Sequence, residues 1–333
     1  MWVRACVGVS GLTLWCLVAT LGLISGRAEA RPCELRRLAS VDLIVHNDEL
    51  LVPVTLDGHA ATMTLNIAGG YNGVIGSKYL KQLDLRQNND NELTGPGFTR
   101  TGYPATTVFG SFSVGSLKYG TPLSFLVVPA PDEPSSTTVP HIGAIGMNLL
   151  AQTDFELDFA NNKLNFYSSD HCPGVVVYWT DHYSSARIHR GLAGNFYFPM
   201  ELQGKKVLAE LSTTLPLTAL GTDATQKLFG FDEKSPDVET ETGADGHVVS
   251  HYRAMALTGN GITITNAHIQ LRPWHSPWYQ CQLLHGADGA VYRDQCAGAE
   301  APLVLGLNIV RRLHLYFATK EEVLYFSDAA ATK

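Results

Sequence analysis

The sequence predicts an all-β protein of two lobes related by a pseudo-twofold axis, because two blocks of strand-forming sequence each occur twice. The first block relates residues 52–66 (VPVTLDGHAATMTLN) to residues 198–212 (FPMELQGKKVLAELS) at a constant offset of 146 residues. Each copy alternates apolar and polar residues on both sides of a glycine, which is the pattern of a β-hairpin. The second strand of the hairpin leads to Asn66 in one copy and to Ser212 in the other.

The second block lies later in each half. It relates residues 145–168 (IGMNLLAQTDFELDFANNKLNFYS) to residues 305–328 (LGLNIVRRLHLYFATKEEVLYFSD) at an offset of 160 residues, so that Gly146 aligns with Gly306. The larger offset means that the second half carries 14 extra residues between its blocks. The stretch between Cys281 and Cys296 is about that long, and we expect it to be the insertion.

Between the blocks, each half has Gly-rich polar sequence followed by alternating strands, at 94–117 and at 242–264. Both stretches are typical of long hairpins with exposed tips. The predicted organisation is a signal segment at 1–30, an N-terminal lobe at 31–172 and a C-terminal lobe at 173–333.

The first thirty residues have the pattern of an export signal. Arg4 precedes an apolar run from Leu12 to Ile24, and AEA at 28–30 places small residues at the two positions that a signal peptidase reads. We expect cleavage before Arg31, with an uncleaved membrane anchor as the alternative. After position 30 no apolar stretch is long enough to span a bilayer. The predicted location is therefore periplasmic or secreted, without membrane contact after signal cleavage.

Composition narrows the class of protein. The 333 residues are 45% hydrophobic and 17% charged, which is typical of a folded globular chain rather than a disordered tail. The formal net charge of −7 argues against a nucleic-acid partner, because such a partner favours a basic protein surface.

Four cysteines remain after the signal, and in an oxidising compartment they suggest two disulfides with three possible connectivities. Sequence separation favours a local Cys281–Cys296 bridge, which leaves Cys33 to pair with Cys172. The alternative is a metal site formed by Cys281, His285 and Cys296. Its spacing matches no known zinc pattern, and we expect neither a metal nor a cofactor.

These features together resemble a known family, because each half looks like one lobe of a pepsin- or retropepsin-type aspartic peptidase. In that family each lobe carries Asp-Thr-Gly at a strand tip, then a flap hairpin, and later an apolar-apolar-Gly segment that threads beside the catalytic turn. The third element fits AIG at 144–146 and VLG at 304–306, and the flap fits the hairpins around Gly95–Tyr103 and Gly243–Tyr252. The resemblance covers nearly the whole chain after the signal. It implies two β-barrel lobes with a cleft between them.

The catalytic triplets of the family fall on residues of different chemistry in this chain. Asp-Thr-Gly aligns with Asn66-Ile67-Ala68 in the first lobe and with Ser212-Thr213-Thr214 in the second. The family's two carboxylates share one proton, so one acts as a base towards water and the other as an acid towards the carbonyl. An amide and a hydroxyl supply neither function. We therefore expect no intact catalytic residue and no chemistry of the dyad type.

The resemblance further implies that the cleft binds an extended peptide or protein segment, and we expect the protein to be a monomer. The residues expected to contact the bound segment lie in the first turn and in the flaps, and they are Gly69, Gly97, Tyr103, Gly246 and Tyr252.

The competing hypothesis is a hydrolase of the same family that acts through another centre. Ser212 could pair with His247 or His251, although nothing in the spacing indicates a third, orienting group. Asp154 and Asp158 form the nearest acidic cluster after the glycine segment. They fall where the family has a structural strand, and we expect them to be solvated.

Peptide mapping under non-reducing conditions tests the cysteine assignment. We expect one linked pair of peptides to contain Cys33 and Cys172 and another to contain Cys281 and Cys296, with no free thiol in the exported chain. Free thiols, or a linked Cys33–Cys281 pair, would show that the scheme is wrong.

Overall fold

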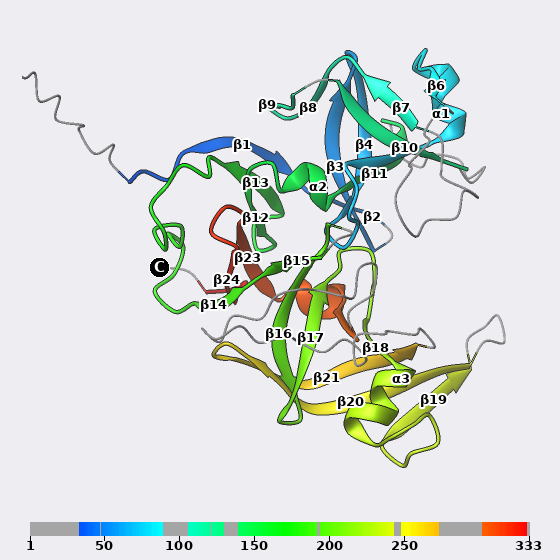
Figure 1. The fold of residues 1–333 in the computed structure, drawn as a ribbon, viewed down its shortest axis with the longest axis vertical. Coiled ribbons are helices and arrows are strands. Elements are labelled where there is room, and N and C mark those ends of the chain that lie inside the picture. Colours follow the sequence, from blue (N-terminus) through cyan, green and yellow to red (C-terminus); the bar gives the residue numbers. More distant parts are fainter. Residues whose placement is uncertain are drawn as a thin grey trace, which may run out of the picture. The chain divides into compact units, whose positions relative to one another are not determined.

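The structure is a computed structural model that describes residues 33–46, 48–88, 106–120, 122–129, 139–191, 194–242, 248–272 and 302–331. Strands dominate these ranges, and the helices among them are short (Figure 1). Several predictions fall outside the described residues, namely those on the signal at 1–30, on Cys281, His285 and Cys296, and on Gly97, Tyr103, Gly246 and His247.

The first half forms a ten-stranded sheet with two short helices, α1 (Ser77–Gln82) and α2 (Met147–Leu150). Its strands are β2 (Ile44–His46), β3 (Glu49–Leu56), β4 (His59–Asn66), β5 (Gly73–Gly76), β6 (Gln87–Asn88), β7 (Thr106–Phe109), β8 (Phe112–Val114), β9 (Leu117–Lys118), β10 (Leu123–Val128) and β11 (His141–Gly146).

The second half forms an eight-stranded sheet with α3 (Thr222–Ala224), a π-helical turn η1 (Thr225–Phe229) and α4 (Leu307–Val310). Its strands are β15 (His189–Arg190), β16 (Phe196–Leu202), β17 (Lys205–Leu211), β18 (Thr218–Gly221), β19 (Val238–Thr242), β20 (Val248–Gly259), β21 (Ile262–Arg272) and β22 (Leu303–Leu305).

The two sheets share one pattern of strand pairing. β11 lies parallel to β4 and antiparallel to β5, and β5 lies parallel to β10. In the same way β22 lies parallel to β17 and antiparallel to β18, and β18 lies parallel to β21. The prediction of an all-β fold with two pseudo-symmetric lobes is therefore confirmed.

The two copies differ most in one connection. Residues 129–140 join β10 to β11, whereas the longer stretch 273–302 joins the equivalent strands β21 and β22. The longer connection of the second half is thus the stretch that contains Cys281 and Cys296, as we expected from its length.

A third sheet of six strands combines both halves of the chain (Figure 1). Its order is β1 (Arg37–Asp42), β13 (Lys163–Tyr167), β12 (Asp154–Asp158), β23 (Leu313–Ala318), β24 (Val323–Asp328) and β14 (Ser184–Arg187). The halves meet where β12 pairs antiparallel with β23, with Leu157 opposite Leu315. Phe155 stacks on Phe317 there, with ring centroids 4.4 Å apart, and both rings belong to the main hydrophobic core.

The prediction that Asp154 and Asp158 are solvated is wrong, because Asp154 is 0% and Asp158 8% exposed. Their side chains alternate along β12 with the apolar core residues Phe155 and Leu157. Asp158 accepts hydrogen bonds from Asn161, whereas Asp154 contacts His171 in the segment 168–183, which connects the two halves. This segment covers the polar face of the sheet with an apolar cluster that includes Val176 and Trp179. The indole of Trp179 stacks on His314 with ring centroids 4.1 Å apart.

Glu156, between the two aspartates, is 0% exposed and is fully hydrogen-bonded. One carboxylate oxygen accepts from Asn165 at 2.6 Å, from Tyr167 at 2.9 Å and from Tyr178 at 3.0 Å. The other lies 2.7 Å from the imidazole of His314 on β23. A buried carboxylate is tolerated only with such partners, so the polar face of this sheet needs both halves of the chain and the connecting segment.

Asp154 makes a second buried pair with His171, whose side chain is 1% exposed and lies 2.5 Å from the carboxylate. The next residue, Cys172, forms a disulfide with Cys33, with Cα atoms 5.2 Å apart, and this prediction is confirmed. Among the described residues no helix is both long and apolar enough to cross a membrane.

The buried pair of His171 and Asp154 predicts how the stability of the fold depends on pH. Burial by itself lowers the pKa of His171, but the hydrogen bond to Asp154 and the charges of Asp154 and Glu321 outweigh it, so this pKa lies above the ordinary 6.5. Protonated His171 therefore stabilises the fold fully below pH 6.5, and the contribution is lost as pH rises through the raised pKa.

We expect the difference in unfolding free energy between wild type and His171→Gln to shrink as the pH rises above about 6.5. Chemical denaturation at several pH values measures it. The control is His59→Gln at an exposed position, for which the difference should stay small at every pH. A difference for His171→Gln that grows with pH would contradict the assignment.

Candidate functional site

The two turns that align with the family's catalytic triplets are each tied by their own first residue. Asn66 ends β4, and its side-chain oxygen accepts a hydrogen bond from the N–H of Ala68 at 3.1 Å. Ser212 follows β17, and its hydroxyl oxygen accepts from the N–H groups of Thr214 at 3.2 Å and Leu215 at 3.1 Å. A side-chain oxygen that bonds a nearby N–H group stabilises a tight turn. Asn66 and Ser212 therefore provide an acceptor to the turn without carrying a charge.

Thr213 joins the two turns directly. Its hydroxyl donates to the carbonyl of Leu65 at 2.5 Å and accepts from the N–H of Ile67 at 3.2 Å. Thr213 is 0% and Ile67 1% exposed, so both bonds are shielded from water. The bridge places the Asn66 turn beside the Ser212 turn. The Ile67 side chain, by contrast, lies in the hydrophobic core.

The apolar-apolar-Gly segments thread beside these turns in both lobes. A Cβ atom on Gly146 would lie 2.3 Å from the carbonyl oxygen of Tyr71, and one on Gly306 would lie 2.4 Å from the carbonyl carbon of Leu217. The residue after each glycine donates its N–H into the turn, to Gly69 at 2.7 Å in lobe one and to Leu215 at 2.8 Å in lobe two. Only glycine permits such close approach, so each segment packs directly against its turn.

Tyr71 is the site residue that the sequence reasoning missed. Its ring lies over Gly69, where an added Cβ would come within 2.6 Å of the ring. Its hydroxyl accepts a hydrogen bond from the side-chain amide of Asn66 at 2.7 Å. The repeat contains the signal that could have found it, because the residue at the equivalent position of lobe two is Leu217. Gly69, predicted to contact the ligand, provides room for Tyr71.

Tyr252, also predicted to contact the ligand, lies on β20 and is 3% exposed. Its ring stacks on Phe231 with centroids 4.4 Å apart and belongs to the hydrophobic core. Exposed or half-buried groups are found instead on Thr214 and on Asn66, Ala68 and Tyr71.

The turns offer hydrogen-bonding groups but no acid–base pair. Neither the stretch 66–71 nor the stretch 212–215 contains an acidic residue or a histidine. Ser212 is 1% exposed, and its bonding partners within the described ranges are Thr214, Leu215 and Leu305, none of which is a base. His251 stacks on His268 with ring centroids 4.5 Å apart, and burial lowers its pKa.

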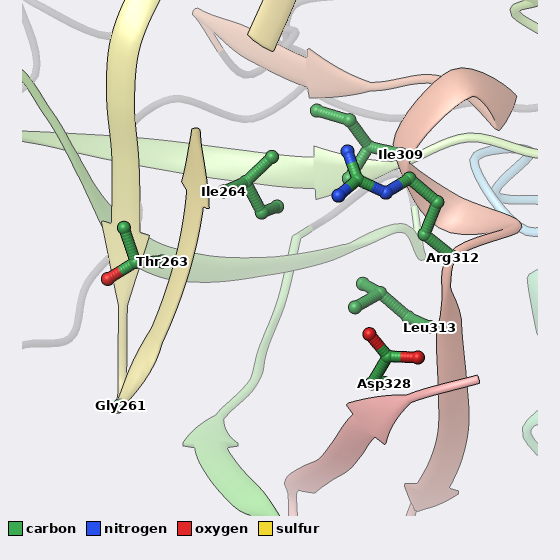
Figure 2. Close-up of a pocket in the computed structure, with 7 residues that line it drawn as sticks. All are labelled: Gly261, Thr263, Ile264, Ile309, Arg312, Leu313 and Asp328. Atoms are coloured by element: carbon green, nitrogen blue, oxygen red, sulfur yellow. The ribbon is translucent and has the colours of Figure 1, made fainter. Parts of the chain in front are cut away.

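A separate pocket of about 250 Å³ lies between the tip of the β20–β21 hairpin and the last helix of lobe two (Figure 2). Ile264, Ile309 and Leu313 give it an apolar wall, and Arg312 and Asp328 supply its charged groups. Gly261 and Thr263 complete the lining. None of these residues belongs to the two turns.

The structural neighbours of this chain include an aspartic proteinase and a seed globulin. The aspartic proteinase from Irpex lacteus is 13% identical with a TM-score of 0.48, and the similarity covers 89% of this chain and 98% of that one. Conglutin gamma, a basic 7S globulin from lupine seeds, is 12% identical with a TM-score of 0.43, over 90% of this chain and 96% of that one. No family model and no curated protein sequence matches the chain.

Thr213→Val tests the bridge between the turns. The variant keeps the shape of the side chain but leaves the buried N–H of Ile67 without its partner, which should cost roughly 1–3 kcal/mol of unfolding free energy. Thr214→Val, one residue away on an exposed side chain, is the matched control and should change stability by less than about 0.5 kcal/mol. Denaturant unfolding of both variants decides the matter. If both variants lose the same unfolding free energy, the Thr213 bridge does not stabilise the protein.

Proposed function

We propose that this chain is an exported, non-catalytic protein of the aspartic-peptidase-like fold that binds an extended polypeptide between its two lobes. The observation that carries the proposal is the chemistry of the paired turns. The positions that align with the family's carboxylates hold Asn66 and Ser212, and each side-chain oxygen is committed to its own turn.

The loss of acid–base chemistry follows from these residues. A carboxylate dyad works because one member is protonated and the other is not, and general acid–base catalysis typically contributes about 10²- to 10⁴-fold. The Asn66 amide has no titratable proton. The Ser212 hydroxyl is a weak base, is buried, and has no neighbouring base among the described residues to activate it as a nucleophile.

Binding needs much less than catalysis. An extended segment is held mainly by main-chain hydrogen bonds, with pockets for alternate side chains. The half-buried Asn66 and Tyr71 and the exposed Thr214 are neutral polar groups suited to such bonds. The preserved Thr213 bridge and the two glycine contacts support the proposal, because they keep the turns in place although the catalytic groups are missing.

The test combines binding and turnover. The purified exported chain should capture capped peptides of random sequence, yet it should leave an unstructured protein substrate intact from about pH 3 to about pH 7. If it captures no peptide, the proposed function is wrong. If it cleaves and Ser212→Ala abolishes the cleavage, the serine-based hydrolase is the correct function.

Restoring the family's Asp-Thr-Gly triplets gives a second test, in which the turnover of the same unstructured protein substrate is measured. Asn66→Asp with Ser212→Asp alone should yield little turnover, because misplacement of a catalytic group by about 1 Å can cost on the order of 10²-fold. Adding Ile67→Thr, Ala68→Gly and Thr214→Gly should give the first variant with detectable cleavage. Turnover by the two-site variant that equals that of the five-site variant would contradict this expectation.

A further inference from the structure

Tyr71 has a hydrogen-bonding direction that its neighbours determine. The side-chain oxygen of Asn66 accepts from the N–H of Ala68 at 3.1 Å, so the NH₂ group of the same amide must be the end that meets Tyr71. That NH₂ group lies 2.7 Å from the phenol oxygen and donates to it. The phenol oxygen is thus an acceptor towards Asn66, and its own hydrogen points elsewhere.

The ring is held firmly enough to make this hydrogen a directed donor. Gly69 and Gly146 both lack the Cβ atom that would collide with Tyr71. The backbone of Tyr71 is bonded on both sides, because its N–H donates to Gly69 at 2.9 Å and its carbonyl accepts from Asn148 at 3.2 Å. No acceptor for the Tyr71 hydroxyl hydrogen occurs among the described residues, and the side chain is only partly buried.

We infer that Tyr71 is the residue that recognises the bound segment at the paired turns, by donating its hydroxyl hydrogen to a main-chain carbonyl of an extended peptide. This inference rests on the proposed function. It names the hydrogen bond by which the bound peptide is held at the turns that lack the carboxylate dyad. Tyr71 binds and does not catalyse.

The identity of the acceptor follows from charge. The hydroxyl is neutral, because burial raises the pKa of Tyr71 above its ordinary value and the hydrogen bond from Asn66 offsets this only in part. Neither turn contributes a cation, so a carboxylate or phosphate would lose its hydration there without a compensating charge. An amide carbonyl is a neutral acceptor that every residue of an extended peptide supplies.

The test uses capped peptides selected from a random pool on the wild-type protein. Tyr71→Phe removes only the hydroxyl and should weaken binding by about 2- to 12-fold, as the loss of one hydrogen bond predicts. Asn66→Asp should weaken it similarly, because the new carboxylate accepts the phenol hydrogen and withdraws it from the peptide. Tyr183→Phe is the control. Tyr183 is 46% exposed and lies at the end of the connecting segment 168–183, so this variant should bind as wild type does.

Ester substitution of the peptide backbone locates the acceptor. An ester carbonyl accepts more weakly than an amide, so one position of the peptide should lose affinity for wild type and show no further loss for Tyr71→Phe. If wild type binds peptides and Tyr71→Phe binds them equally, this inference is overturned while the proposed function stands. If wild type binds none of the pool, the proposed function fails and the inference fails with it.

Discussion

The hydroxyl of Thr213 holds the paired turns together. It bonds to the backbone on both sides of Asn66, at the carbonyl of Leu65 and the N–H of Ile67, although it belongs to the other half of the chain. Because the bridge is buried, water does not compete for either bond. The Asn66 side chain and Tyr71, which depends on it, therefore take their positions from a residue in lobe two.

The buried polar face of the six-stranded sheet is the second junction between the halves. Glu156 from the first half and His314 from the second meet at 2.7 Å, and Tyr178 of the connecting segment completes the carboxylate's bonds. Removing one partner from such a group leaves a buried charge uncompensated, which is far costlier than losing an exposed ion pair. The turns and the sheet thus constrain the same pair of lobes at two separate places.

Much of the fold could be predicted from the sequence because the chain encodes it twice. The offset of 160 residues paired Gly146 with Gly306, and the family resemblance placed both correctly beside their turns. Asp154 and Asp158 were misjudged because alternation along a strand shows which residues share a face, but not what covers it. Tyr71 was missed because it lies outside the triplet. Its hydrogen bond with Asn66 spans a turn, and no local sequence pattern specifies the geometry of that turn. Binding by the turns stays a prediction.

The pairing of β12 with β23 has a consequence for the order in which the chain becomes structured. β12 carries Asp154 and Glu156, but the strand beside it, with His314 and Tyr316, lies near the other end of the chain. Contacts so distant in sequence form slowly, since a long loop must close before they are gained. An N-terminal half that leaves the ribosome first has acidic groups ready for burial and lacks the β23 partner to bury them against. The burial of the β12 carboxylates thus depends on β23, so this face of the sheet is complete only once the C-terminal half of the chain has been added.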